Sequence, residues 1–136
     1  LIGLLDFRSA LAAIGIREGF QWIDGSFVED CEALRQRPPG DLDVVTFARR
    51  PGSTLQEWCA IFQNNLNLFD PLTAKTLFSC DAYFVDLAKP PHLLVLDTAY
   101  FSGLVAHQRN SAQWNGMLGI SLDSDDAEAR QLIAES

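Results

Sequence analysis

Two aspartates, Asp41 and Asp43, stand one residue apart at the start of the apolar segment 44–48. Residues two apart in an extended strand point to the same side, so a strand here holds the carboxylates side by side, about 7 Å apart at their backbones. Like charges at this distance repel each other, and burial increases the repulsion. A divalent cation removes that repulsion, and hard cations such as Mg²⁺ bind carboxylate oxygens. The pair therefore indicates a metal site.

A third acid is needed if the site holds two metal ions. Asp81 opens the apolar segment AYFV just as Asp41 opens its own segment, so alignment of the two strands brings Asp81 beside the pair. Asp86 is the competing candidate on the same strand. Because Asp81 and Asp86 are five residues apart, they face opposite sides, and only one of them can join the pair. We favour Asp81, while Asp24 is expected to cap the turn that follows it, with an approach to the site as its alternative.

Alternating strands and helices are expected to position these acids. Apolar periodicity, turn residues and helix caps predict strands at 20–24, 41–48, 79–87 and 117–122, and helices at 5–18, 27–35, 53 or 54 to about 64, 71–78, 97–107 and 125–135.

Several caps and stops mark the ends of these elements. Gly19 is expected to end the first helix, Ser26 to cap the short second helix, and Ser124 to cap the last one. The first two strands have a short connection, which predicts an antiparallel pair. The chain is thus expected to be one α/β (α+β) domain over residues 1–136, with a small mixed sheet of about four strands and helices packed on one side.

Composition narrows the class of protein. The formal net charge is −8 and the sequence pI is about 4.5, which makes nucleic acid an unlikely partner. Three cysteines without paired spacing, and two histidines fifteen residues apart, predict neither a disulfide framework nor a zinc site, and place the protein in a reducing cytoplasm. No apolar run approaches the roughly 18 residues that span a bilayer, and no signal peptide is expected.

Taken together, these motifs resemble the nucleotidyltransferase superfamily of the DNA polymerase beta type, through Gly25-Ser26, the DLD segment and a lone acid on a later strand. The segments WIDGSFVED, DLDVV, CDAYFVD and WNGMLGI look more closely like a family of short bacterial proteins of that superfamily, whose function is largely uncharacterised. This resemblance covers residues 20–122 and implies the nucleotidyltransferase fold.

The resemblance implies a role for each matching acid. Asp41 and Asp43 would ligate Mg²⁺ (or Mn²⁺) on the nucleotide phosphates, and Asp81 would assist the second metal and accept the proton of an incoming hydroxyl.

The same resemblance implies residues that hold the nucleotide. Gly25 would let the backbone approach a phosphate, and Ser26 would hold the triphosphate at a helix N-terminus. Lys75, Arg49 and Arg109 are candidates to bind phosphate; each has a simpler reading as a solvated or helix-capping side chain.

The implied function is transfer of a nucleoside monophosphate from an NTP to an unidentified acceptor hydroxyl on a protein or small molecule. By the same resemblance, a helical protein partner in a toxin–antitoxin or defence module is expected. The alternative, from another class, is a catalytically inactive relative that acts as a binding module through a protein partner.

Overall fold

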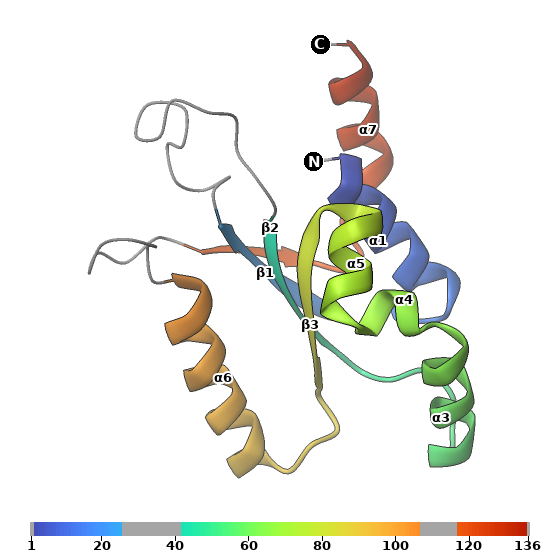
Figure 1. The fold of residues 1–136 in the computed structure, drawn as a ribbon, viewed down its shortest axis with the longest axis vertical. Helices are drawn as coiled ribbons and strands as arrows, with labels where there is room; N and C mark the ends of the chain where they lie inside the picture. The colour runs from blue at the N-terminus through green and yellow to red at the C-terminus, as the bar shows by residue number, and fades with distance from the viewer. Residues whose placement is uncertain (1, 26–41, 107–116, 136) are drawn as a thin grey trace.

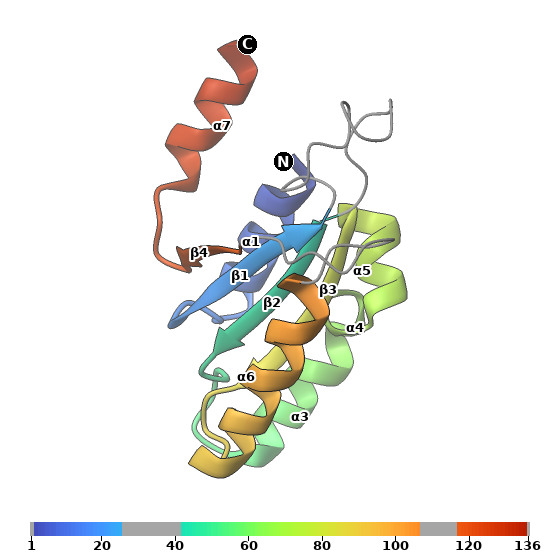
Figure 2. The same cartoon turned by 90° about the vertical axis from the view of Figure 1, so that its left-hand side faces the viewer.

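The computed structural model describes residues 2–25, 42–106 and 117–135. Figure 1 shows the arrangement of its elements, and Figure 2 shows the same ribbon from the side. In chain order they are α1 (Ile2–Ala13), β1 (Gly19–Gly25), β2 (Leu42–Ala48), α3 (Leu55–Asn64), α4 (Leu66–Phe69), α5 (Pro71–Phe78), β3 (Cys80–Asp86), α6 (Pro91–Ala106), β4 (Leu118–Ser121) and α7 (Asp126–Glu135).

The described strands form one four-stranded sheet in the order β3-β2-β1-β4. β1 is antiparallel to both of its neighbours, β2 and β4, whereas β2 and β3 are parallel. The antiparallel pairing expected for the first two strands is therefore confirmed, and so is the mixed α+β sheet. The parallel pairing follows from the crossover through α3, α4 and α5, which returns the chain to the same end of the sheet.

Both faces of the sheet carry helices, which differs from the one-sided arrangement expected from the sequence. Val44 and Ala48 of β2 belong to a buried cluster with α1, α4 and α5, while Val45 and Phe47 belong to a second cluster with Leu94 and Phe101 of α6. Figure 1 accordingly shows the sheet between α6 on one side and α1, α4 and α5 on the other. The reason is that β2 is apolar at successive residues, so both of its faces need cover.

Several helices and strands begin or end at other residues than expected, in each case at or near a glycine or a proline. The first helix ends at Ala13, not 18, because Gly15 adopts a φ of 94°. The long helix begins at Pro91, not 97, since proline is tolerated in a first helical turn. Gly19, which was expected to end a helix, instead begins β1.

Two caps were tested by the structure, with opposite outcomes. The Thr54 side chain accepts a hydrogen bond from the Glu57 amide, which confirms a cap at the start of α3. At α7, the amide of Glu128 donates to the carboxylate of Asp125. The helix is therefore capped by Asp125, one residue after the expected Ser124. The helix expected at 27–35 and its Ser26 cap lie outside the described residues.

A buried arginine joins four elements on the α1 face of the sheet. Arg8 donates from Nε to Asp126 at 2.7 Å, from Nη1 to Gln21 at 2.8 Å and from Nη2 to the carbonyl of Ser121 at 2.9 Å. Gln21 in turn donates to the hydroxyl of Thr46 at 3.0 Å. The Arg8 side chain is only 3% exposed, so its charge depends on these partners.

Replacing Arg8 with alanine is expected to destabilise the fold by about 3 kcal/mol or more, because the buried Gln21 and the carboxylate of Asp126 lose their donor. Urea unfolding measures this loss. Arg17→Ala is the matched control: Arg17 is exposed, and within the described residues its side chain donates to the carbonyl of Ala12 alone, so its removal should cost less than about 0.5 kcal/mol. Equal losses in the two variants would contradict a structural role for the Arg8 network.

Within the described ranges, no helix has both the length and the apolar character needed to cross a membrane.

Candidate functional site

Three aspartates lie in a row across three neighbouring strands. The strand pairing places Asp24 of β1 opposite Asp43 of β2, and Asp43 beside Asp81 of β3. Paired residues on neighbouring strands point to the same face, and such strands are about 4.8 Å apart. We call Asp24, Asp43 and Asp81 the acid row. It occupies the face that α6 covers, at the end of the sheet where β1 finishes and β2 and β3 begin.

Burial increases the electrostatic repulsion among the carboxylates of the acid row. Asp24 is fully buried, and Asp81 is 20% exposed at its side chain. Carboxylates that are close together and removed from water disfavour each other's charge, so a positive charge nearby stabilises the ionised row. This is the electrostatic condition under which a cation binds carboxylate oxygens.

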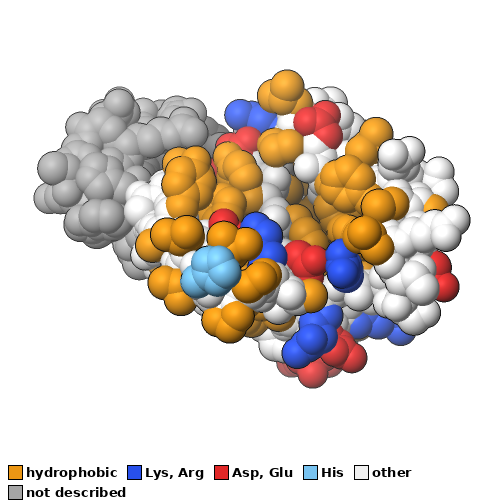
Figure 3. All heavy atoms as spheres, turned by 90° about the horizontal axis from the view of Figure 1, so that it is seen from below, with side chains coloured by type: hydrophobic (Ala, Val, Ile, Leu, Met, Phe, Trp, Pro, Cys, Tyr) orange, Lys and Arg blue, Asp and Glu red, His pale blue; other side chains and the backbone are white. Residues whose placement is uncertain are grey.

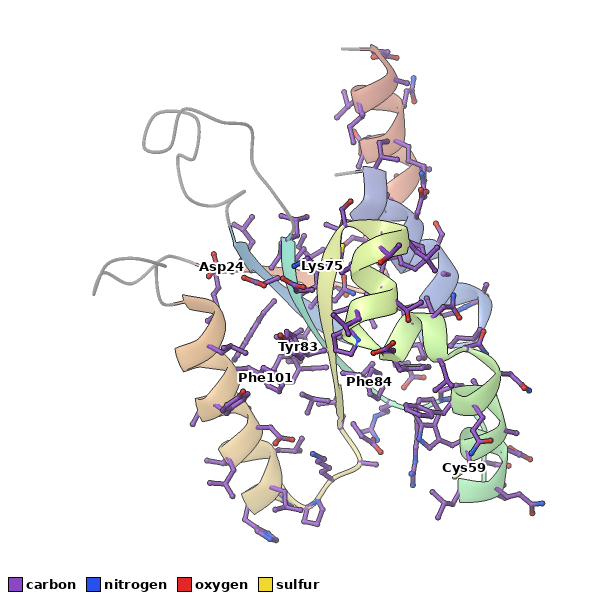
Figure 4. The ribbon with its side chains drawn as sticks, in the orientation of Figure 1. Asp24, Cys59, Lys75, Tyr83, Phe84 and Phe101 are labelled. Atoms are coloured by element: carbon purple, nitrogen blue, oxygen red, sulfur yellow. The ribbon has the colours of Figure 1, made fainter. Side chains whose placement is uncertain are left out.

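Lys75 supplies one positive charge at the edge of the row. Its Nζ lies 3.7 Å from Oδ1 of Asp81, and its side chain remains 47% exposed. The local fold sets this approach: α5 ends at Phe78, and Ser79 adopts the left-handed conformation with a φ of 56°. The chain therefore enters β3 at once, which leaves Lys75 one helical turn from the start of the strand. Figure 4 shows Asp24 and Lys75 at the same end of the sheet.

Tyr83 lies on the same face of β3, two residues after Asp81. Burial raises the pKa of its hydroxyl above the ordinary value, and the negative charges of Asp81 and Asp43 raise it further, while Lys75 lowers it. The Tyr83 ring also packs against Phe101 of α6, with ring centroids 5.4 Å apart. The hydroxyl of Tyr83 therefore lies within the electrostatic field of the acid row.

The Tyr83 hydroxyl offers a probe of that field, because the chain contains only two tyrosines. In Tyr100→Phe, the phenolate absorbance of Tyr83 should titrate with a midpoint above about 10, and adding Asp81→Asn should lower that midpoint. Since the folded pKa is the raised one, the associated stability is present below the unfolded pKa and is lost as the pH rises through the folded pKa. A midpoint that is insensitive to Asp81→Asn would place the Tyr83 hydroxyl outside the field of the row.

Asp86, the competing acid on β3, lies at the opposite end of the strand. It pairs in register with Ala48, far from Asp43. Its carboxylate lies 3.6 Å from Nε of Arg50 and accepts a hydrogen bond from the amide of Ala88 at 2.8 Å. These contacts give Asp86 a structural role at the turn after β3, so the structure brings Asp81 to Asp43 and leaves Asp86 away from it.

The remaining predicted site residues lie at the edge of the acid row, away from it, or outside the described residues. Gly25 is the last residue of β1 and pairs with Leu42. Arg49, on the strand end after β2, lies 3.9 Å from Glu18 and is exposed, away from the acid row. Ser26, Asp41 and Arg109 lie outside the described residues. Among the residues that are described, no group of three His, Cys, Asp or Glu side chains forms a metal-binding cluster.

An apolar hollow of about 220 Å³ lies elsewhere, on α3, lined by Trp58, Cys59, Phe62 and Gln63. Trp58 stacks on Phe84 with ring centroids 5.6 Å apart, so it supports the core from that side. None of these described lining residues is charged, so they offer no counter-charge to phosphate groups. Figure 4 shows Cys59 far from Asp24.

The burial of Asp24 and its place opposite Asp43 differ from the first expectation for this residue. Asp24 was expected first to cap a turn, yet it is fully buried and opposite Asp43. The sequence contained a sign of this position, because Trp22 and Asp24 point to the same face of their strand. In the observed antiparallel register, that face brings Asp24 opposite the second aspartate of the DLD segment.

In a comparison with protein families, the model described as a family of unknown function, DUF6932, matches residues 1–121. No curated protein and no solved structure matches the chain. The matched range includes the whole acid row and Lys75. Helix α7 lies beyond that range, and it is attached to α1 by the Arg8–Asp126 pair and by Arg130, whose Nη2 lies 2.9 Å from Asp6.

Proposed function

The chain belongs to the DUF6932 family, a family of unknown function, and we propose that it is a nucleotidyltransferase that moves a nucleoside monophosphate from an NTP to an acceptor hydroxyl. The observation that carries the proposal is the acid row, in which Asp43 and Asp81 are neighbours on parallel strands and Asp24 lies opposite Asp43. The order of a Gly-Ser turn, a DLD strand and a third acid adds the resemblance to the nucleotidyltransferase superfamily.

Carboxylate oxygens are hard ligands of the kind that Mg²⁺ and Mn²⁺ prefer, and since no three described side chains form a metal-binding cluster, the proposed site requires a further acid. In the proposed site Asp43 and Asp81 would hold the metal together with Asp41, and Asp24 would add negative charge from the buried side of the row. A bound metal would supply positive charge that offsets the negative charge developing during the transfer.

In the proposed reaction the acceptor oxygen attacks the α-phosphorus of the NTP. The bond from that phosphorus to the oxygen bridging the α- and β-phosphates breaks, and pyrophosphate leaves. The proton of the acceptor hydroxyl passes to the carboxylate of Asp81, which is therefore the general base. Asp81 suits this role because its side chain is partly exposed, whereas Asp24 is fully buried.

Phosphate binding is assigned to the positive and backbone groups around the row. Lys75 has a flexible stem and a half-exposed ammonium group 3.7 Å from Asp81, so it can turn toward a triphosphate. Gly25 ends β1 beside the row, where a backbone without a side chain allows a phosphate to approach. Ser26 and Arg109 complete the proposed nucleotide site.

The net charge of −8 favours a protein or small-molecule acceptor over nucleic acid. We place the reaction in the cytoplasm, which the free thiols of Cys59 and Cys80 support. A helical protein partner in a toxin–antitoxin or defence module is the proposed biological setting.

The direct test is incubation of the protein with Mg²⁺, a cell lysate and each of the four NTPs labelled at the α-phosphate. Label should pass to an acceptor from at least one NTP, and a γ-phosphate label should not, because it leaves with pyrophosphate. Absence of transfer, together with calorimetry that shows no NTP binding in the presence of Mg²⁺, would reject the enzyme and leave the inactive binding module.

A further inference from the structure

The ammonium group of Lys75 already lies where a cation bound to the acid row would lie. Its Nζ is 3.7 Å from Oδ1 of Asp81, and the side chains of Lys75 and Asp81 are 47% and 20% exposed. Asp81 belongs to β3, the edge strand of the sheet, and pairs in register with Asp43. The charge of Lys75 therefore reaches the row from its outer strand and offsets part of the repulsion between these two carboxylates.

The backbone of Lys75 is fixed, whereas its charge is movable. The carbonyl of Lys75 accepts a hydrogen bond from the amide of Ser79 at 3.0 Å, at the left-handed end of α5. The distance of 3.7 Å to Asp81 is longer than the roughly 2.7–2.9 Å of a charge-assisted hydrogen bond, so the ion pair is loose. Since the flexible stem is half exposed, the ammonium group can turn to another acceptor without any movement of the helix.

A divalent cation and the ammonium group of Lys75 compete for one carboxylate. A cation held by Asp43 and Asp81 takes the oxygens whose charge Lys75 offsets, and two positive charges beside Asp81 repel each other. A free cation therefore binds the row against the charge of Lys75. Phosphate reverses this effect, because its oxygens are negative and accept hydrogen bonds from an ammonium group as a carboxylate does.

We infer that Lys75 determines the form in which the row accepts metal: a metal–triphosphate complex is bound in preference to the free cation, because phosphate draws the ammonium group away from Asp81. Lys75 exchanges its partner in this binding step, carboxylate for phosphate. By linkage, the triphosphate strengthens metal binding by the same factor as metal strengthens binding of the triphosphate. The inference rests on the proposed function, since it takes the acid row as the metal site.

Lys75→Met tests the inference, because methionine retains a long side chain and removes the charge. Affinity for Mn²⁺ alone, measured by electron paramagnetic resonance of the free ion, should rise about threefold to tenfold. The rise is limited because solvent screens a partly exposed pair. Calorimetry with Mn²⁺–tripolyphosphate should show that the advantage of the complex over the free ion falls at least about tenfold. Lys75→Arg keeps the charge and should retain most of this advantage.

Arg50→Met is the matched control. Nε of Arg50 lies 3.6 Å from Asp86, whose side chain is also 20% exposed, so this variant removes the same charge from a similar pair at the other end of β3. Figure 3 views the molecule from that end and shows basic and acidic side chains lying side by side. Arg50→Met should bind Mn²⁺ and Mn²⁺–tripolyphosphate like the wild type.

The possible outcomes separate this inference from the proposed function. If Lys75→Met binds free Mn²⁺ no more tightly than the wild type does, the inference is overturned and the proposed metal site remains. An equal gain in Arg50→Met also overturns it, because the gain then reflects net charge alone. If neither the wild type nor Lys75→Met binds Mn²⁺, alone or as the complex, the row is not a metal site and the proposed function is rejected together with the inference.

Discussion

Asp81→Asn should abolish nucleotidyl transfer while leaving most of the affinity for nucleotide. The carboxylate beside Asp43 is then replaced by an amide, which cannot accept the proton of the acceptor hydroxyl. Loss of a general base alone costs about 10²–10⁴-fold in rate, and the weakened metal site adds to that loss. Nucleotide binding persists because Asp41 and Asp43 still hold metal in the proposed site. Labelled-NTP transfer and calorimetry with Mg²⁺ measure the two effects separately.

Asp86→Asn is a closely matched control for this experiment. Asp81 and Asp86 both belong to β3, both have side chains 20% exposed, and each lies within 4 Å of one basic side chain, Lys75 and Arg50 respectively. They differ in position, since only Asp81 is beside Asp43. Asp86→Asn should therefore change stability slightly and leave transfer intact. The opposite pattern, with Asp81→Asn active and Asp86→Asn inactive, would remove the acid row from the mechanism.

Local patterns predicted the sheet and the position of Asp81 within it. β2 and β3 each carry an acid as their second residue, and their parallel, in-register pairing makes Asp43 and Asp81 neighbours. The antiparallel pairing of β1 with β2 was predicted as well, although 16 residues separate Gly25 from Leu42 and a connection of that length does not by itself decide the direction. For the acids, the relevant information is the alternation of side chains, which lies within the strands themselves.

Features that depend on tertiary packing were not predictable in the same way. The start of α6 at Pro91 was missed because two successive prolines suggest a loop, whereas the second occupies the first turn of the helix. Helices pack on both faces of the sheet because both β2 and α6 are apolar on most sides. Neither segment taken alone shows that the two pack together. The burial of Asp24 depends on the register of β1 against β2 and on cover of that face.

Binding of Mn²⁺ should raise the thermal stability of the wild type and fail to do so in Asp41→Asn with Asp43→Asn. A ligand that binds only the folded state at about a hundred times its Kd contributes about 2.7 kcal/mol, which corresponds to a rise in Tm of roughly 10 °C for a domain of this size. The double variant loses two proposed ligands, so its Tm should be independent of Mn²⁺. Without metal it should be as stable as the wild type or more so, because the repulsion among Asp24, Asp43 and Asp81 is reduced.

Asp86→Asn should retain the full shift in Tm with Mn²⁺, since Asp86 lies at the other end of β3. Equal shifts in the wild type and the double variant would mean that the metal binds at a different place, and the acid row would then require another explanation.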